Sequence, residues 1–227
     1  MGKTILLFWL VLFGFEGNQA PKASFCQREL QIEKAGLVDI QKLDPEILVD
    51  LKYSGKDNFI GFDVYGCLSK AYLQKDAAFQ LAKASTKLRK LHPELRLLVY
   101  DAARPKWAQQ ILWDSLKKPE SQKHVYVADP KKGSIHNYGC AVDITICDKN
   151  RKALDMGTSY DFFGLLAQPR KEAETLRKGQ LSKIQVENRK MLRKLMSEAG
   201  FQPISSEWWH FNYGSLRSAK SKYKAVE

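Results

Sequence analysis

The stretch SIHNYGCAVDITICD, residues 134–148, combines the pattern of a buried strand with two ionisable side chains. Apolar residues dominate from 140 to 147, and the period of two places Asp143 on the face opposite Val142 and Ile144. An unpaired carboxylate among such neighbours would cost several kcal/mol of folding free energy. The sequence therefore predicts a buried strand and, beside it, a group that compensates the charge of Asp143.

His136 is the first candidate for that group. It lies seven residues before Asp143, and Gly139 between them allows the chain to turn sharply. The histidine can then swing towards the strand face that carries the carboxylate. A histidine and a carboxylate that converge on one point are ligands that Zn²⁺ accepts, and the ion would neutralise the buried charge.

A third ligand must come from the remaining histidines. His92 precedes Pro93 and is predicted to do no more than end a helix, while His124 lies in a polar loop and is the weaker candidate. His210, three residues after Glu207 in EWWH, is the predicted third ligand. Three protein ligands leave one tetrahedral position for water, as in catalytic zinc sites.

Two further residues are predicted to take part in catalysis. Glu207 is the candidate general base, but on a regular strand it would face away from His210, so the segment must turn or bulge there. Arg104 is held extended by Pro105, and its fixed charge could stabilise an oxyanion that forms when water attacks a carbonyl. A surface salt bridge with Asp101 is the alternative interpretation of Arg104.

The first twenty residues resemble a secretory signal peptide, with Lys3, an apolar run and small residues before a cut expected between positions 20 and 23. The run is short for a membrane span, although a retained anchor is the alternative. We therefore expect an exported protein, periplasmic or extracellular, without a stable membrane span after cleavage. The remaining residues, roughly 205, suit one domain. Its expected range is 24–215, followed by a basic tail at 216–227.

The net charge of +12 raises the question of an anionic partner. The basic segments lack interleaved aromatic residues that could stack on bases, so nucleic acid is not the expected partner. Solvated helix faces, or attraction to an anionic cell-wall polymer, are the two interpretations. Of the four cysteines, Cys140 and Cys147 differ by an odd number and could not easily bridge on one strand, but the sequence does not choose a pairing.

Strand and helix patterns alternate without a regular βαβ rhythm, which favours an α+β fold. We expect one compact domain with a mostly antiparallel central sheet, flanking helices and a zinc site on the sheet face. The expected elements are two short strands at 37–53 broken at Asp44-Pro45, a helix at 69–91 with Ser69 as N-cap, a strand at 95–101, a helix starting at Pro105, a strand at 140–148 and a helix that ends at Gly200.

These motifs resemble those of one enzyme family. SIHNYGCAVD is similar to S-x-H-x-x-G-x-A-x-D, and EWWH to E-x-x-H, of the zinc D-alanyl-D-alanine dipeptidases of the vancomycin-resistance type and their D,D-carboxypeptidase relatives. YDAARP (100–105), DNFIGFDVYG (57–66) and DMGTSYDFF (155–163) resemble other segments of the family. The similarity runs from about residue 37 to 213.

The resemblance implies a role for each matching residue. One zinc ion per chain would be bound by His136, Asp143 and His210, with Glu207 as general base, Arg104 at the scissile carbonyl, and Ser134 and Asp161 lining the substrate pocket. Asp161 would bind a free amino terminus.

The implied substrate is D-alanyl-D-alanine or a related D-amino-acid dipeptide in cell-wall peptide turnover. A D,D- or L,D-carboxypeptidase that trims peptidoglycan stems is the alternative, with peptidoglycan fragments as partners. A non-catalytic wall-binding protein is a third hypothesis.

Overall fold

The computed structural model describes residues 26–227, so the predicted signal peptide and its cut lie outside the described residues. A five-stranded sheet forms the centre, and only its β2–β4 pair is parallel. In spatial order its strands are β2 (Leu48–Val49), β4 (Leu95–Asp101), β5 (Ala141–Asp148), β7 (His210–Asn212) and β6 (Gln202–Pro203). A second, antiparallel sheet pairs β1 (Val38–Asp39) with β3 (Tyr72–Leu73).

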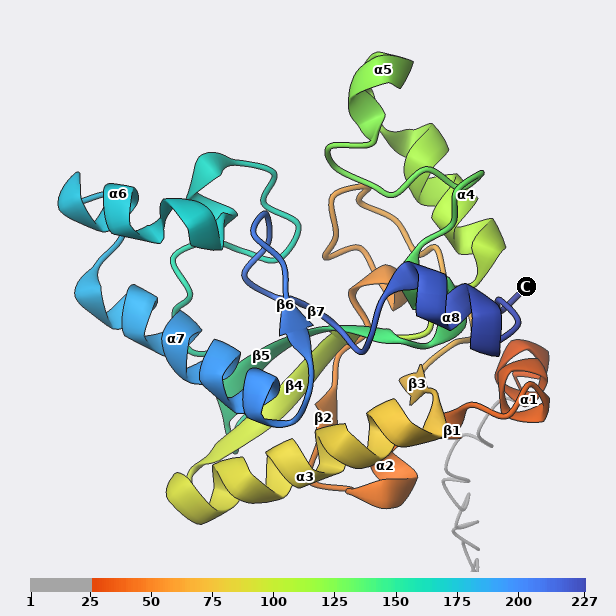
Figure 1. Cartoon of the computed structure of the whole chain (residues 1–227), viewed down its shortest axis with the longest axis horizontal. Helices are drawn as coiled ribbons and strands as arrows, with labels where there is room; N and C mark the ends of the chain where they lie inside the picture. Colours follow the sequence, from red (N-terminus) through yellow and green to blue (C-terminus); the bar gives the residue numbers. More distant parts are fainter. Residues whose placement is uncertain (1–25) are drawn as a thin grey trace, which may run out of the picture.

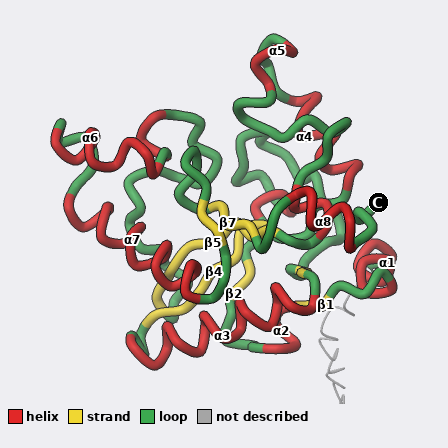
Figure 2. The backbone as a smooth tube through the Cα atoms, viewed as in Figure 1, coloured by secondary structure: helices red, strands yellow, loops and turns green. Residues whose placement is uncertain are grey.

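Helices surround this sheet, and the prediction of an α+β domain is confirmed. The α-helices are α1 (Gln27–Lys34), α2 (Ile40–Leu43), α3 (Lys75–Leu91), α4 (Lys106–Ser115), α5 (Glu120–Lys123), α6 (Glu172–Arg177), α7 (Lys183–Glu198) and α8 (Leu216–Lys222). Short 3₁₀ turns are η1 (Lys52–Ser54), η2 (Ile135–Tyr138), η3 (Leu165–Ala167) and η4 (Pro169–Lys171). The long helices α3 and α7 pack together beside the sheet (Figure 1). Long loops gather at the other end of the molecule (Figure 2).

The strand predicted from the opening stretch is the most buried of the sheet. Both faces of β5 are covered. Val142 and Ile144 belong to the main core on one face, and Asp143 and Thr145 on the opposite face are buried as well. The pairing of β4 with β5 shifts after Val99, so that Asp101 stands opposite Asp143. Two buried carboxylates thus lie on neighbouring strands at one place, and cationic groups must compensate both.

Some predicted boundaries were wrong. The helix expected from Ser69 begins at Lys75, because Tyr72 and Leu73 are held extended by pairing with β1. Between the two short strands expected at 37–53 the chain forms α2, and each strand is only two residues long. Pro105 occupies the N-cap position of α4, one place before the first helical residue.

The four cysteines are divided between one disulfide and two free thiols. Cys26 and Cys67 form a disulfide that ties α1 to the loop before β3, while Cys140 and Cys147 are buried free thiols.

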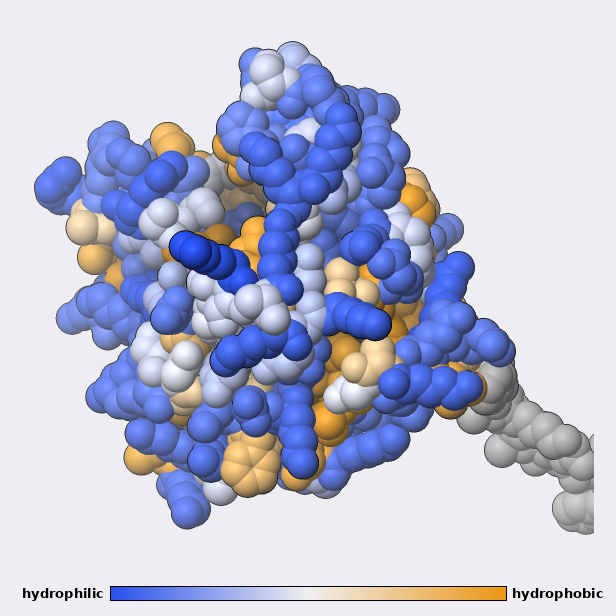
Figure 3. Space-filling model, turned by 45° about the vertical axis from the view of Figure 1, so that its right-hand side comes forward, coloured by the Kyte–Doolittle hydropathy of each residue, from blue (hydrophilic) through white to orange (hydrophobic). Residues whose placement is uncertain are grey.

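Hydrophilic side chains cover most of the face in Figure 3, with smaller hydrophobic areas between them. Within residues 26–227, no helix combines the length and the apolar character needed to cross a bilayer.

Candidate active site

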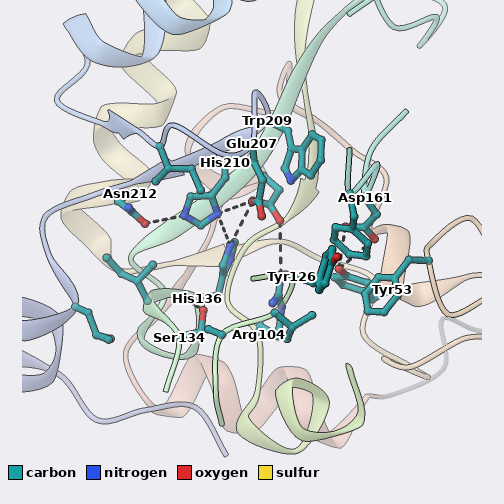
Figure 4. Close-up of a pocket in the computed structure, with 18 of the residues that line it drawn as sticks. Tyr53, Arg104, Tyr126, Ser134, His136, Asp161, Glu207, Trp209, His210 and Asn212 are labelled. Atoms are coloured by element: carbon teal, nitrogen blue, oxygen red, sulfur yellow. Dashed lines mark hydrogen bonds and ion pairs between the residues drawn. The ribbon is translucent and has the colours of Figure 1, made fainter. Parts of the chain in front are cut away.

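One cavity of about 290 Å³ opens on the sheet face that carries Asp143. All the residues predicted for the site line it: Arg104, Ser134, His136, Asp143, Asp161, Glu207 and His210. Figure 4 shows His136, His210 and Asn212 on one side, Asp161, Tyr53 and Tyr126 on the other, and Arg104 and Glu207 between them. The two other histidines lie elsewhere, since His92 caps α3 and His124 is exposed after α5.

Backbone structure brings the three predicted metal ligands together. Asp143 and His210 are direct partners across β5 and β7. His136 reaches them from η2, which ends at Gly139 in the left-handed conformation with φ of 64°. A Cβ at Gly139 would lie 2.6 Å from Leu37 Cδ2 and 3.2 Å from the Gln74 nitrogen, so only glycine suits this turn. The turn predicted at Gly139 is therefore present.

The donor atoms of the three residues are close to one another. Nδ1 of His210 lies 2.9 Å from Oδ1 of Asp143, and Nε2 of His136 lies 3.3 Å from the same oxygen. The two ring nitrogens are 3.1 Å apart. In the part of the chain that the structure describes, this is the cluster of His, Cys, Asp and Glu side chains whose ligand atoms could hold a metal ion.

Neighbouring oxygens fix which ring nitrogens face the cluster. Nδ1 of His136 lies 2.7 Å from the carbonyl oxygen of Ala102, which can only accept, so Nδ1 carries a proton and Nε2 is the ring nitrogen that faces the cluster. Nε2 of His210 lies 2.7 Å from Oδ1 of Asn212, leaving Nδ1 towards the cluster. Such outer partners orient metal-binding histidines. Asn212 was not predicted, although its position two residues after His210 on a strand places both on one face.

The second oxygen of Asp143 has its own partners. Tyr160 donates a hydrogen bond of 2.9 Å to Oδ2, and Nη2 of Arg104 lies 3.6 Å from it. Burial acts to raise the pKa of Asp143, but the charge of His136 and the hydrogen bonds from both histidines hold it well below its usual range. Asp143 is therefore an anion surrounded by donors, as the opening stretch of sequence requires.

Arg104 is buried and held on several sides. Its Nε and Nη2 donate to Oδ2 of Asp101 at 2.8 and 2.6 Å, and its Nη1 donates to Oε1 of Gln109 at 3.0 Å. The amide of Gln109 also donates to the carbonyl of Ala128, which lines the cavity. The salt bridge with Asp101 therefore exists, but it is buried rather than on the surface. It holds the guanidinium of Arg104 at the cavity.

Glu207 enters the cavity from a bend. Residues 208 and 209 form the bend just before β7, so Glu207 and His210 both line the cavity despite their spacing of three. Burial, reinforced by the charge of Asp143, raises the pKa of Glu207 to about 7. A carboxyl group with such a pKa can both accept and donate a proton near neutral pH.

Asp161 lies at the opposite side of the cavity in an unusual backbone conformation, with φ of 58°. Tyr53 donates to its carboxylate at 3.2 Å, and burial of the tyrosine raises its pKa, which keeps the hydroxyl protonated. Burial and the charge of Asp143 raise the pKa of Asp161 well above its usual range. This carboxyl group would gain from a cationic partner in the cavity.

Ser134 has a structural contact besides its place in the cavity wall. Its hydroxyl caps η2 by accepting from the backbone nitrogen of His136, and Asn137 completes the capping box. The loop that carries His136 is therefore fixed at its first residue.

The class of site is that of a metallopeptidase: a His-Asp-His cluster, a glutamate and an arginine around one cavity. Residues 33–225 match the model of peptidase M15, the D-Ala-D-Ala dipeptidases, and the chain belongs to this family of hydrolytic enzymes.

Curated relatives agree with this family. The chain is 36% identical over 175 residues to D-alanyl-D-alanine dipeptidase of Escherichia coli, covering 77% of this chain and 83% of the relative. It is 29% identical over 180 residues to D-alanyl-D-alanine dipeptidase of Enterococcus faecalis, covering 71% and 83%. A solved structure of the LD-carboxypeptidase LdcB aligns over 66% of this chain and 63% of its own, with a TM-score of 0.40 and 20% identity.

Proposed function

We propose that this peptidase is an exported zinc enzyme that hydrolyses D-alanyl-D-alanine or a related D-amino-acid dipeptide in cell-wall peptide turnover. The observation that carries the proposal is the convergence of His136, Asp143 and His210 beside Glu207 in one cavity. Family membership supports the hydrolytic chemistry, and the names of the relatives support the dipeptide.

The donor set suits zinc. Bonds of about 2.0–2.1 Å in a tetrahedral arrangement separate neighbouring ligand atoms by about 3.3 Å. The observed separations of 2.9, 3.1 and 3.3 Å equal that value or are up to about 0.4 Å shorter. A zinc ion held here would act as a Lewis acid and activate water for attack on the peptide carbonyl.

Three side chains of the protein would carry out proton transfer, charge stabilisation and substrate binding. Glu207 accepts the proton of the attacking water and delivers it to the leaving amine, a type of help worth roughly 10²- to 10⁴-fold in rate. Arg104, fixed by Asp101 and Gln109, offers its remaining N–H groups to the oxygen that becomes negative. Asp161 binds the amino group of the substrate, because an ammonium supplies the countercharge that this buried carboxyl group lacks.

Purified protein and free dipeptides test the proposal. D-alanyl-D-alanine should be cleaved to free D-alanine, a chelator should abolish the activity, and stoichiometric zinc should restore it. Glu207→Gln should lose roughly 10²- to 10⁴-fold in kcat while still binding zinc. Zinc-loaded protein that cleaves none of a panel of D,D- and L,D-dipeptides would refute the dipeptidase proposal.

N-acetyl-D-alanyl-D-alanine separates the dipeptidase from the alternative carboxypeptidase. Acetylation removes the positive charge that Asp161 is proposed to bind, so a dipeptidase should lose most of its kcat/KM on this substrate. Equal rates on the free and the acetylated dipeptide, or faster release from peptidoglycan stem peptides, would favour the carboxypeptidase.

A further inference from the structure

Three aromatic rings close the side of the cavity near Asp161. Phe59, Tyr126 and Phe163 come from three different loops, and all three line the cavity. Phe163 packs edge to face on Phe59 and on Tyr126, with ring centroids 5.1 Å apart in both pairs. Phe59 in turn contacts Tyr53, the residue that donates to Asp161. We call Phe59, Tyr126 and Phe163 the aromatic wall.

The aromatic wall stands where one part of the substrate must lie, if the proposed function holds. The amino group and the side chain of the first residue share one carbon atom. With the amino group at Asp161 and the carbonyl at Arg104, that side chain lies in the part of the cavity around Asp161. Figure 4 places Tyr126 and Tyr53 beside Asp161, across the cavity from His210. The side chain of the amino-terminal residue therefore faces the wall.

Two rings of the aromatic wall, Phe59 and Phe163, lie between the cavity and a second hollow. This outer hollow, about 450 Å³, shares Phe59, Asp161 and Phe163 with the lining of the cavity. The cavity itself, about 290 Å³, is small for a ligand site, since such pockets usually measure about 300–1,000 Å³. A larger side chain could gain room only by separating rings that pack on one another.

We propose that the aromatic wall restricts the amino-terminal residue of the substrate to small side chains, with Phe163 as the main determinant of this specificity. Phe163 contacts both other rings, lies between the two hollows and is 36% exposed, so truncating it should open the wall without removing core packing. Phe162 provides a matched control, because it is 40% exposed and lines the outer hollow but not the cavity.

Zinc-loaded wild type, Phe163→Ala and Phe162→Ala should be compared on D-Ala-D-Ala, D-Phe-D-Ala and D-Ala-D-Phe. Wild type should prefer D-Ala-D-Ala to D-Phe-D-Ala by roughly 100-fold or more in kcat/KM. Phe163→Ala should reduce this preference by roughly tenfold or more, because its kcat/KM on D-Phe-D-Ala rises. Its relative rate on D-Ala-D-Phe should stay unchanged, because the second residue does not face the wall. Phe162→Ala should behave as wild type.

The proposal fails if the kcat/KM of wild type on D-Phe-D-Ala equals that on D-Ala-D-Ala. It also fails if folded Phe163→Ala keeps the wild-type preference. An equal gain on D-Phe-D-Ala and D-Ala-D-Phe would show general loosening and would also refute it. Should Phe163→Ala fail to fold, Phe59→Ala opens the same aromatic wall and must reduce the preference for D-Ala-D-Ala over D-Phe-D-Ala to the same extent. Absence of cleavage of every dipeptide by wild type would instead refute the proposed function, so the two failures are distinct.

Discussion

The raised pKa of Glu207 has a measurable cost in stability. In protein stripped of metal, burial and the charge of Asp143 raise this pKa from 4.5 to about 7. Each pKa unit corresponds to about 1.36 kcal/mol, so ionised Glu207 should destabilise the fold by roughly 3 kcal/mol. The unfolded chain releases this proton near pH 4.5 and the folded chain near pH 7, so the penalty grows between these values. Glu207→Gln removes it.

Urea unfolding of wild type and Glu207→Gln, both metal-free, measures this effect from pH 4 to pH 8.5. Near pH 4 the two proteins should have nearly equal unfolding free energies, since the glutamate is protonated in both states. Above pH 7 the variant should be the more stable by up to about 3 kcal/mol. A difference that is constant with pH, or a wild type more stable at pH 8, would show that Glu207 ionises without penalty and would refute the reasoning.

Asn212→Ala should weaken zinc binding roughly 10- to 100-fold, because the ring of His210 loses its acceptor; competition with a coloured chelator measures this, and unchanged affinity would exclude the role. Replacing Cys26 and Cys67 by serine opens a cross-link across 41 residues and should lower the unfolding free energy by roughly 2–4 kcal/mol; an unshifted urea midpoint would contradict it. Gln109→Met should lower kcat/KM roughly tenfold with an unchanged circular dichroism spectrum, because the guanidinium loses one acceptor; full activity would show that this amide is dispensable.

Local patterns in the sequence predicted how the residues at the centre of the cavity are brought together. Period two placed Asp143 on the polar face of its strand, and Gly139 indicated the turn that brings His136 to it. The spacing of Glu207 and His210 required a bend, and residues 208–209 form one. Each of these features depends on residues close together in the chain, which is why sequence reasoning reached them.

Features that depend on distant partners were out of reach. The start of α3 is displaced by the pairing of Tyr72 with Asp39, far earlier in the sequence. Gln109 is close to Arg104 in the chain, but its support of the guanidinium was missed because no local pattern shows that the helix after Pro105 turns this amide inward. The aromatic wall combines three loops, and only the folded chain shows that their rings meet.

Asp143 and His210 are neighbours across two paired strands, whereas much of the cavity's lining comes from loops. Hydrogen bonding between strands fixes the distance between these two proposed metal ligands, and changes in loop length or composition do not alter it. The specificity of the scaffold should therefore change, during evolution or in the laboratory, through exchange of loops while Asp143 and His210 stay paired across the sheet. Selection for new peptides should alter residues around 57–63, 125–128 and 161–163 long before it alters β5 or β7.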